Sequence, residues 1–146
     1  MPVLNAAFMG GSPLVQVAIG VSMPRSNALV AAGRQPPNPQ LCLALLDTGA
    51  SGTCVDPSIL TSLALTPTGS TNVVTPSSAV PHQCGMFDVS LIIFMNNQQL
   101  HLASLTIPVM GLPLVHQGFA AIIGRDVLAQ GMLVYNGKQG QLTLSF

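Results

Sequence analysis

"LALLDTGASGTC", residues 43–54, places a single acid at the end of an apolar run. Residues 43–46 are all apolar, and the carboxylate of Asp47 comes next, followed at once by Thr48 and Gly49. A short continuous apolar run of this kind is typical of a buried strand. Holding a charge beside such a strand costs free energy unless the charge has a partner. Asp47 therefore has either a chemical role or a local one, in which it accepts backbone hydrogen bonds and caps a turn.

The composition restricts the classes of protein to which the chain can belong. Its 146 residues are enough for one domain with a core of its own. Hydrophobic residues make up 49% and charged residues only 5%, and the formal net charge is zero. The chain therefore has no basic face for nucleic acid and no polybasic patch for a membrane surface. A surface so poor in charge favours burial of part of it in a subunit interface.

The first charged residue is Arg25, so residues 1–24 are a candidate signal peptide or membrane anchor. No Lys or Arg precedes their apolar part, and polar residues such as Asn5 and Gln16 interrupt it. A secretory signal or a spanning helix has a different pattern, so strands are the preferred interpretation. We therefore expect a cytoplasmic protein.

The three cysteines, Cys42, Cys54 and Cys84, agree with that expectation. Their number is odd and no C-x-x-C spacing occurs, which argues against a disulfide framework and fits a reducing compartment. A thiol-metal site made by these cysteines and His82 is an alternative, but its spacing matches no common zinc pattern. No metal or cofactor is expected.

Most of the chain has the pattern of a β-protein. Alternating or continuous apolar stretches, separated by turn residues, predict a series of strands. These are residues 13–21, 41–46, 70–95 (two strands around a small polar tip at 75–79), 98–110, 120–124 and 132–146 (a hairpin with an Asn-Gly turn signal).

Helices are expected to be few and short. Asp56 is a potential N-cap with a proline after it, so residues 56–65 predict a short helix. Residues 125–131 predict a second one, which Gly131 ends. Residues 24–40 contain four prolines and predict an exposed loop.

Two segments together resemble the retroviral-type, or retropepsin-like, aspartic proteases. "ALLDTGA" (44–50) is similar to the catalytic loop of that family, and "AIIGRDVL" (121–128) is similar to its second signature. "PLVQVAIG" (13–20) resembles the strand ahead of the catalytic one, and "LTLSF" (142–146) resembles the closing terminal strand. Asp-Thr-Gly alone is a weak signal, but its position after an apolar strand and before the second signature makes it specific.

The resemblance implies one domain over residues 1–146, mostly β. Its fold would be a single-lobe closed β-barrel with one or two short helices, completed as a homodimer. Residues 24–40 would be a surface loop insertion, and residues 70–95 would be the flap hairpin that closes over substrate. Terminal strands of two subunits would interleave into one sheet, the candidates here being residues 3–8 and 141–146.

The chemistry that the resemblance implies requires a second acid. Peptide hydrolysis by this route uses two carboxylates that share one proton. The chain has one Asp-Thr-Gly, whereas Asp56, Asp88 and Asp126 occur in other settings. A two-fold homodimer supplies the second carboxylate by symmetry, with Asp47 of each subunit at the axis.

The expected activity is that of an aspartic endopeptidase with Asp47 as the catalytic group. An extended peptide would bind by strand addition, and Phe119 would help to line its side-chain pockets. The expected substrate-binding residues are Thr48, Gly49, Ala50, Ser77, Ser78, Ala79, Ala121 and Ile122.

The chain also departs from the family pattern. Retroviral enzymes have an acid four residues after the catalytic Asp, which pairs with the Arg of the second signature; here that position is Ser51. Arg125 therefore needs another partner, for which Asp126, Asp56 or a backbone carbonyl is available. The predicted flap also lacks a glycine-rich tip.

Two other functions compete with peptide hydrolysis through Asp47. One is a peptide-binding module on the same fold that does not turn its ligand over. The other is catalysis by a Cys or Ser nucleophile with a histidine, but His82, His101 and His116 form no recognisable triad pattern.

Overall fold

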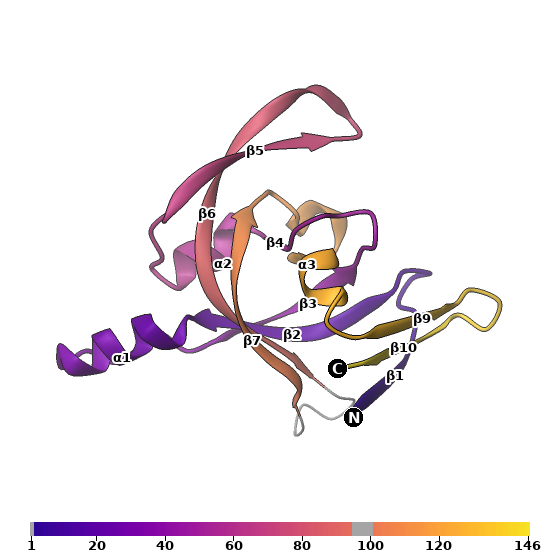
Figure 1. Ribbon diagram of the computed structural model, residues 1–146, viewed down its shortest axis with the longest axis horizontal. Coiled ribbons are helices and arrows are strands. Elements are labelled where there is room, and N and C mark those ends of the chain that lie inside the picture. Colours follow the sequence, from indigo (N-terminus) through magenta and orange to yellow (C-terminus); the bar gives the residue numbers. More distant parts are fainter. Residues whose placement is uncertain (1, 95–100) are drawn as a thin grey trace.

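The computed structural model describes residues 2–94 and 101–146. In the described part, ten strands, three α-helices and one short 3-10 helix follow one another along the chain (Figure 1). They are β1 (Val3–Ala7), β2 (Leu14–Val21), α1 (Met23–Ala31), β3 (Gln40–Leu46), β4 (Cys54–Val55), α2 (Pro57–Ser62), β5 (Gly69–Thr75), β6 (Ser78–Phe94), β7 (His101–Gly111), η1 (Val115–Gln117), β8 (Ala121–Ile123), α3 (Arg125–Leu128), β9 (Met132–Asn136) and β10 (Gln141–Ser145). Residue 95 of the strand pair predicted at 70–95 and residues 98–100 of the strand predicted at 98–110 lie outside the described residues.

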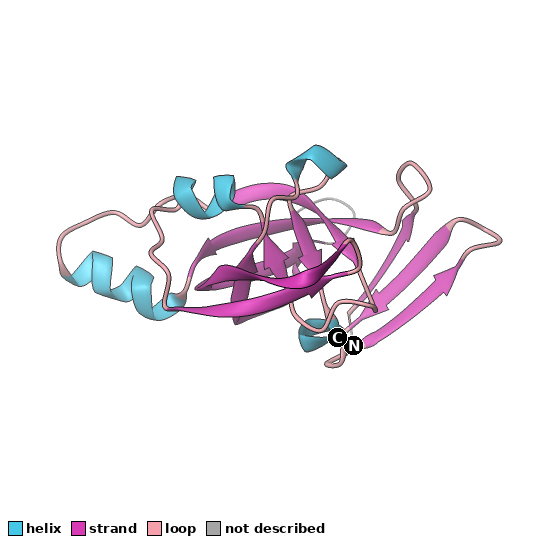
Figure 2. Cartoon of the chain, turned by 90° about the horizontal axis from the view of Figure 1, so that it is seen from above, coloured by secondary structure: helices cyan, strands magenta, loops and turns pink. Residues whose placement is uncertain are grey.

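Six strands close a barrel, and a closed barrel is what the family resemblance implies. Their order is β2-β3-β8-β4-β7-β6, and β6 pairs back onto β2, with Val17 opposite Ile93 and Val21 opposite Val89. Strand β5 pairs only with β6, and the two form a hairpin that rises from the barrel in Figure 1. Figure 2 shows the same strands from above.

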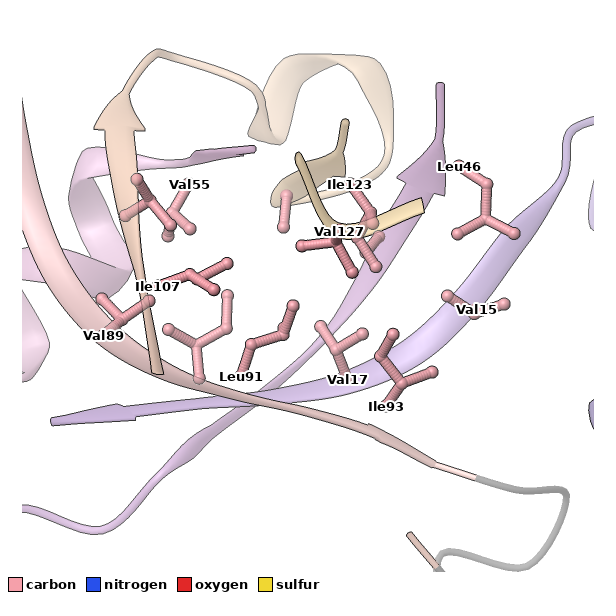
Figure 3. Close-up of a cluster of buried hydrophobic side chains, with 14 of the residues drawn as sticks. Val15, Val17, Leu46, Val55, Val89, Leu91, Ile93, Ile107, Ile123 and Val127 are labelled. Carbon is pink, nitrogen blue, oxygen red and sulfur yellow. The ribbon is translucent and has the colours of Figure 1, made fainter. Parts of the chain in front are cut away.

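The barrel interior is filled by alternate residues of its strands. Val89, Leu91 and Ile93 of β6 lie on one face of the strand and are at most 2% exposed. They meet Val17 of β2 and Val127 of α3 in the cluster shown in Figure 3. Side chains two residues apart point to the same face of a strand, so these three residues share the face of β6 that lies in the core.

Strands β3 and β8 lie side by side in parallel, with Ala44 opposite Ala121 and Leu46 opposite Ile123. The Asp-Thr-Gly loop follows β3, and helix α3 follows β8. Because parallel strands end at the same edge of a sheet, the two signature segments meet there.

The terminal strands form a second sheet in the order β1-β10-β9. Val3 lies opposite Ser145, and Ala7 lies opposite Gln141, so the two ends of the chain lie next to each other in Figures 1 and 2. In the single chain, β1 thus pairs with its own β10, and β1 and β9 are the edge strands.

The predicted hairpin at 132–146 is confirmed, but its turn is longer than the Asn-Gly signal indicates. Asn136 lies opposite Gln141, so four residues, 137–140, form the connection. Gly140 adopts a positive φ of 62°, which glycine tolerates without a steric penalty.

The expectation of a loop over 24–40 is wrong in its first part, since α1 occupies Met23–Ala31. The side chain of Ser22 caps this helix by accepting a hydrogen bond from the N–H of Arg25, and Pro24 lies in the first turn. Both are favourable at a helix N-terminus. No residue of α1 is buried, so the segment does lie on the surface.

Among the helices described, none combines the length and the apolar character that crossing a bilayer requires.

The predicted helix with Asp56 as its N-cap is confirmed as α2. Asp56 is only 4% exposed, and its carboxylate accepts hydrogen bonds from the N–H and hydroxyl of Ser58 and from the N–H groups of Leu114 and Val115. Burial opposes the charge on this carboxylate, but the hydrogen bonds outweigh it and lower the pKa of Asp56 to about 2. Asp56 therefore fixes the start of η1 to helix α2.

Replacing Asp56 with Asn is expected to destabilise the chain in a pH-dependent way. A folded-state pKa below the unfolded value adds stability above pH 4, and this stability is lost as the pH falls toward 2. Asp56→Asn should lower the free energy of unfolding by about 2 kcal/mol at pH 6 and by much less at pH 2. Urea unfolding at both pH values measures this, with Asp88→Asn as the exposed-acid control. An equal loss at both pH values would contradict the assignment.

Candidate active site

Asp47 begins the loop after β3 and is half-buried. Its N–H donates to the carbonyl of Ile123 (3.0 Å), which holds the residue to the end of β8. Its Oδ1 accepts a hydrogen bond from the N–H of Gly49 (2.8 Å), and its carbonyl accepts one from Ala50 (3.2 Å). The capped turn that the sequence allows is therefore present, and it orients the carboxylate.

The two signature segments cross at a pair of glycines. The N–H of Arg125 donates to the carbonyl of Ala50 (2.9 Å). A Cβ on Gly124 would lie 2.6 Å from the carbonyl carbon and oxygen of Gly52, which is closer than real Cβ contacts. The glycine of the second signature thus allows the start of α3 to lie directly against the loop of Asp47.

Arg125 uses backbone carbonyls where retroviral enzymes use an acid. Its Nη1 donates to the carbonyl of Thr48 (2.8 Å) and to that of Gly49 (3.2 Å). The sequence left Asp126, Asp56 or a backbone carbonyl as partners of Arg125, and these two hydrogen bonds are made to backbone carbonyls. The guanidinium therefore holds the Asp-Thr-Gly loop without an ion pair.

Asp126 and Thr53 make a second connection between the same segments. The N–H and hydroxyl of Thr53 donate to the two carboxylate oxygens of Asp126, at 3.0 and 2.8 Å. The hydroxyl oxygen of Thr53 also accepts a hydrogen bond from the N–H of Gly124 (3.2 Å). Thr53 is 2% exposed. Sequence reasoning missed Thr53 because its partner lies 73 residues away and no local pattern marks the pair.

A cavity of about 380 Å³, here called the smaller cavity, lies between this loop and the β5–β6 hairpin. Asp47 is the one carboxylate among its described lining residues. The other walls come from β5 and the turn of the hairpin, from Met110 and Leu112, and from Ile122 of β8. A larger cavity of about 850 Å³ shares Thr75, Pro76, Leu112 and Ile122 with it and continues beneath the hairpin.

Five of the predicted site residues line these two cavities. The smaller cavity is lined by Asp47, Gly49, Ala50 and Ile122, and the larger one by Ser77 and Ile122. The predicted tip of the hairpin is also found, because Thr75 pairs with Ser78 and leaves Pro76 and Ser77 as the turn. The described chain thus brings the Asp-Thr-Gly loop and the hairpin tip to one cleft.

The remaining predicted site residues line neither cavity. Thr48 contributes its carbonyl to Arg125 instead, and Ala121 is 1% exposed in the core. Ser78 and Ala79 begin β6 beside the turn, and Phe119 lines a separate pocket with Leu43 and Val115.

The cysteines do not form the alternative sites that were considered. Burial raises the pKa of Cys54, which lines the smaller cavity, to about 11, and burial raises the pKa of Cys42 to about 12. Neither thiol is therefore a ready nucleophile. The four candidate metal ligands are all described, and no group of three or more His, Cys, Asp or Glu residues among the described residues could hold a metal ion.

The chain was compared with known proteins. No family model matches it, and no curated protein matches it in sequence. It is similar in structure to a retropepsin-like aspartic protease from Rickettsia conorii, known from a crystal structure. The alignment has a TM-score of 0.57 and 14% sequence identity, and it covers 98% of this chain and 89% of that chain. The chain therefore has the single-lobe, closed-barrel fold of the retropepsin-like aspartic proteases.

Proposed function

We propose that the chain is an aspartic endopeptidase that acts as a homodimer, with Asp47 of each subunit as the catalytic group. The observation that carries this proposal is the position of Asp47. Its carboxylate follows β3, in which Ala44 and Leu46 are buried, and it lines a cleft beneath a hairpin. The loop of Asp47 is held by α3 through Arg125. A fixed acid in a cleft is typical of a catalytic group.

The second carboxylate of the proposed dyad comes from a second copy of the chain, because the other three acids have other positions. Asp56 caps α2 and is buried, and Asp126 is bound to Thr53. Asp88 is exposed on β6, opposite Pro108 of β7. A two-fold axis beside Asp47 would place two identical carboxylates together.

In the proposed reaction, a water molecule lies between the two carboxylates, which share one proton. The ionised Asp47 takes a proton from this water as its oxygen attacks the scissile carbonyl carbon. The protonated Asp47 of the other subunit gives its proton to the carbonyl oxygen, and a tetrahedral diol forms. The Asp47 that took the proton from water then gives it to the amide nitrogen, while the other Asp47 takes a proton from one hydroxyl of the diol. The C–N bond breaks, the amine and the new carboxylic acid leave, and the two carboxylates again share one proton.

The terminal sheet is the proposed dimer contact. Among the described strands, β1 and β9 each pair with β10 alone, so they are the edges of this sheet, where a further strand can add. Large apolar side chains are exposed on these strands: Val3, Met132, Val134 and Tyr135. Terminal strands of a second copy would extend the sheet and cover them.

The β5–β6 hairpin is the proposed flap. Its turn, at Pro76 and Ser77, lines the larger cavity, and the hydroxyls of Thr75 and Ser77 lie 3.1 Å apart. An extended peptide would lie between this hairpin and the loop of Asp47, by strand addition. The turn contains proline and no glycine, so motion of the whole hairpin would admit substrate.

One observation favours a peptide-binding module that does not cleave. Oδ1 of Asp47 already accepts a hydrogen bond from Gly49 within the single chain. The acid therefore has a structural partner without any dyad, and a binding protein on this fold could retain it for that reason.

The proposed location is the cytoplasm, since all three cysteines are free thiols. A reducing compartment preserves thiols in this state.

Digestion of a peptide library between pH 4 and 7 tests the proposal. We expect cleavage that a statine-containing inhibitor blocks and iodoacetamide does not. Added hydroxylamine should yield no hydroxamate, because water attacks directly and no acyl-enzyme forms. Activity per subunit should fall on dilution in step with the loss of dimer in sedimentation, because one chain holds half of the site. Peptide binding without cleavage, by a monomer at all concentrations, would instead establish the binding module.

A further inference from the structure

The larger cavity carries two imidazoles on different walls. His82 comes from β6, in the hairpin, and His116 comes from η1, on the barrel side. The polar side chains of Ser77, Gln83 and Gln117 line the same cavity. None of its described lining residues is Asp, Glu, Lys or Arg, so the histidines are its only basic groups.

His82 is exposed and belongs to β6, the longer strand of the hairpin. It lies directly opposite Val73 of β5, and Cys84 lies opposite Thr71. Residues opposite each other in an antiparallel pair share a face of the sheet. Val73 lines the smaller cavity, and Cys84 lines the larger one together with His82. The neighbouring residues Val74 and Gln83 line these cavities as well, so His82 is placed at the cleft by the lining of the larger cavity itself.

No carboxylate lines the larger cavity beside His82 and His116, so a carboxylate of a ligand would meet no acid of the described lining. Burial raises the pKa of Cys84, the thiol beside His82, which keeps it neutral. Asp56 lies behind η1, but it is buried, it already accepts four hydrogen bonds and it does not line the cavity. Asp47 lines the adjoining smaller cavity. Histidine is the side chain that gains positive charge in mild acid.

We infer that the larger cavity is a subsite for an acidic side chain of the bound peptide, whose carboxylate His82 and His116 bind from opposite walls. A positive charge on these histidines would be a large part of the chain's basic charge, because the chain has only four Lys and Arg residues in total. The subsite would make the chain selective for peptides with Asp or Glu at the position beneath the hairpin. This inference deepens the proposed function, but it concerns binding and does not require cleavage.

The test compares extended peptides that differ only by Glu or Gln at one position, moved stepwise along the sequence. Binding to the Asp47→Asn protein is measured by fluorescence anisotropy at pH 5.5 and pH 8. At one position, the Glu peptide should bind about tenfold more tightly than the Gln peptide at pH 5.5, and the advantage should disappear at pH 8. The double variant His82→Gln/His116→Gln should lose the preference and bind both peptides equally.

A matched control removes one positive charge elsewhere. Lys138 lies in the turn between β9 and β10 and lines neither cavity, so Lys138→Gln should keep the full preference. No Glu preference at any position, or a preference that survives in the double histidine variant, would overturn the inference. If the Asp47→Asn protein binds acidic peptides selectively and the wild-type protein cleaves no peptide, the subsite is supported and the protease is rejected. Cleavage without acid selectivity would do the reverse.

Discussion

Replacing Asp47 with Asn is expected to lower the rate of peptide cleavage by at least about a thousandfold. An amide neither takes the proton from water nor returns one to the scissile bond. Its oxygen can still accept the hydrogen bond that Gly49 donates to Oδ1, so the loop should keep its conformation. The loss should therefore appear in kcat, while peptide binding and the fraction of dimer stay close to wild type.

The control for Asp47→Asn is Asp88→Asn, which also removes one carboxylate. Asp88 is exposed on β6 and lines neither cavity, so its replacement should leave cleavage unchanged. Initial rates for both variants, with sedimentation to check the dimer, decide the matter. Cleavage that persists in a folded Asp47→Asn protein would mean that another group performs the chemistry.

Gly124→Ala is expected to have a large effect on stability. The new methyl group would lie 2.6 Å from the carbonyl carbon and oxygen of Gly52. Both contacts are backbone atoms, so no side chain can rotate away, and either the loop or α3 must move. We expect the free energy of unfolding to fall by about 3 kcal/mol. Cleavage should fall as well, because Arg125 and Asp126 hold the loop of Asp47 from the same helix.

Gly69→Ala is the matched control for this prediction. A Cβ at Gly69, the first residue of β5, would meet nothing within 4 Å, and its φ does not lie in the left-handed region. Its replacement should change stability by no more than about 0.5 kcal/mol. Urea unfolding of the two variants at neutral pH makes the comparison. Equal effects of the two would show that the crossing of the signature segments is not tightly packed.

Local signals explain why much of the fold could be predicted. The apolar residues of β2 mark a strand that is buried along almost its whole length, and the pairing of Asp56 with a following proline marks the start of α2. The segments 44–50 and 121–128 were recognised separately, and the structure brings them to one edge of the barrel. Each of these features depends on residues close together in sequence.

The features that were missed depend on the tertiary structure or lack a buried face. Helix α1 buries no residue, so it has no apolar period to indicate it, and the prolines around it favoured a loop. The hydrogen bonds between Thr53 and Asp126, and the shared cavity of His82 and His116, arise only when distant segments meet. The sequence contains those residues but no local sign that they belong together.

The pairing of β1 with β10 also bears on the order of events during synthesis. Residues 3–7 are made more than a hundred residues before their partners, residues 141–145. The terminal sheet can therefore form only after the barrel segments have emerged, and its closure carries a large loop-entropy cost. If two copies associate through this sheet, their assembly has to wait for residues 141–145, which keeps incomplete nascent chains from pairing.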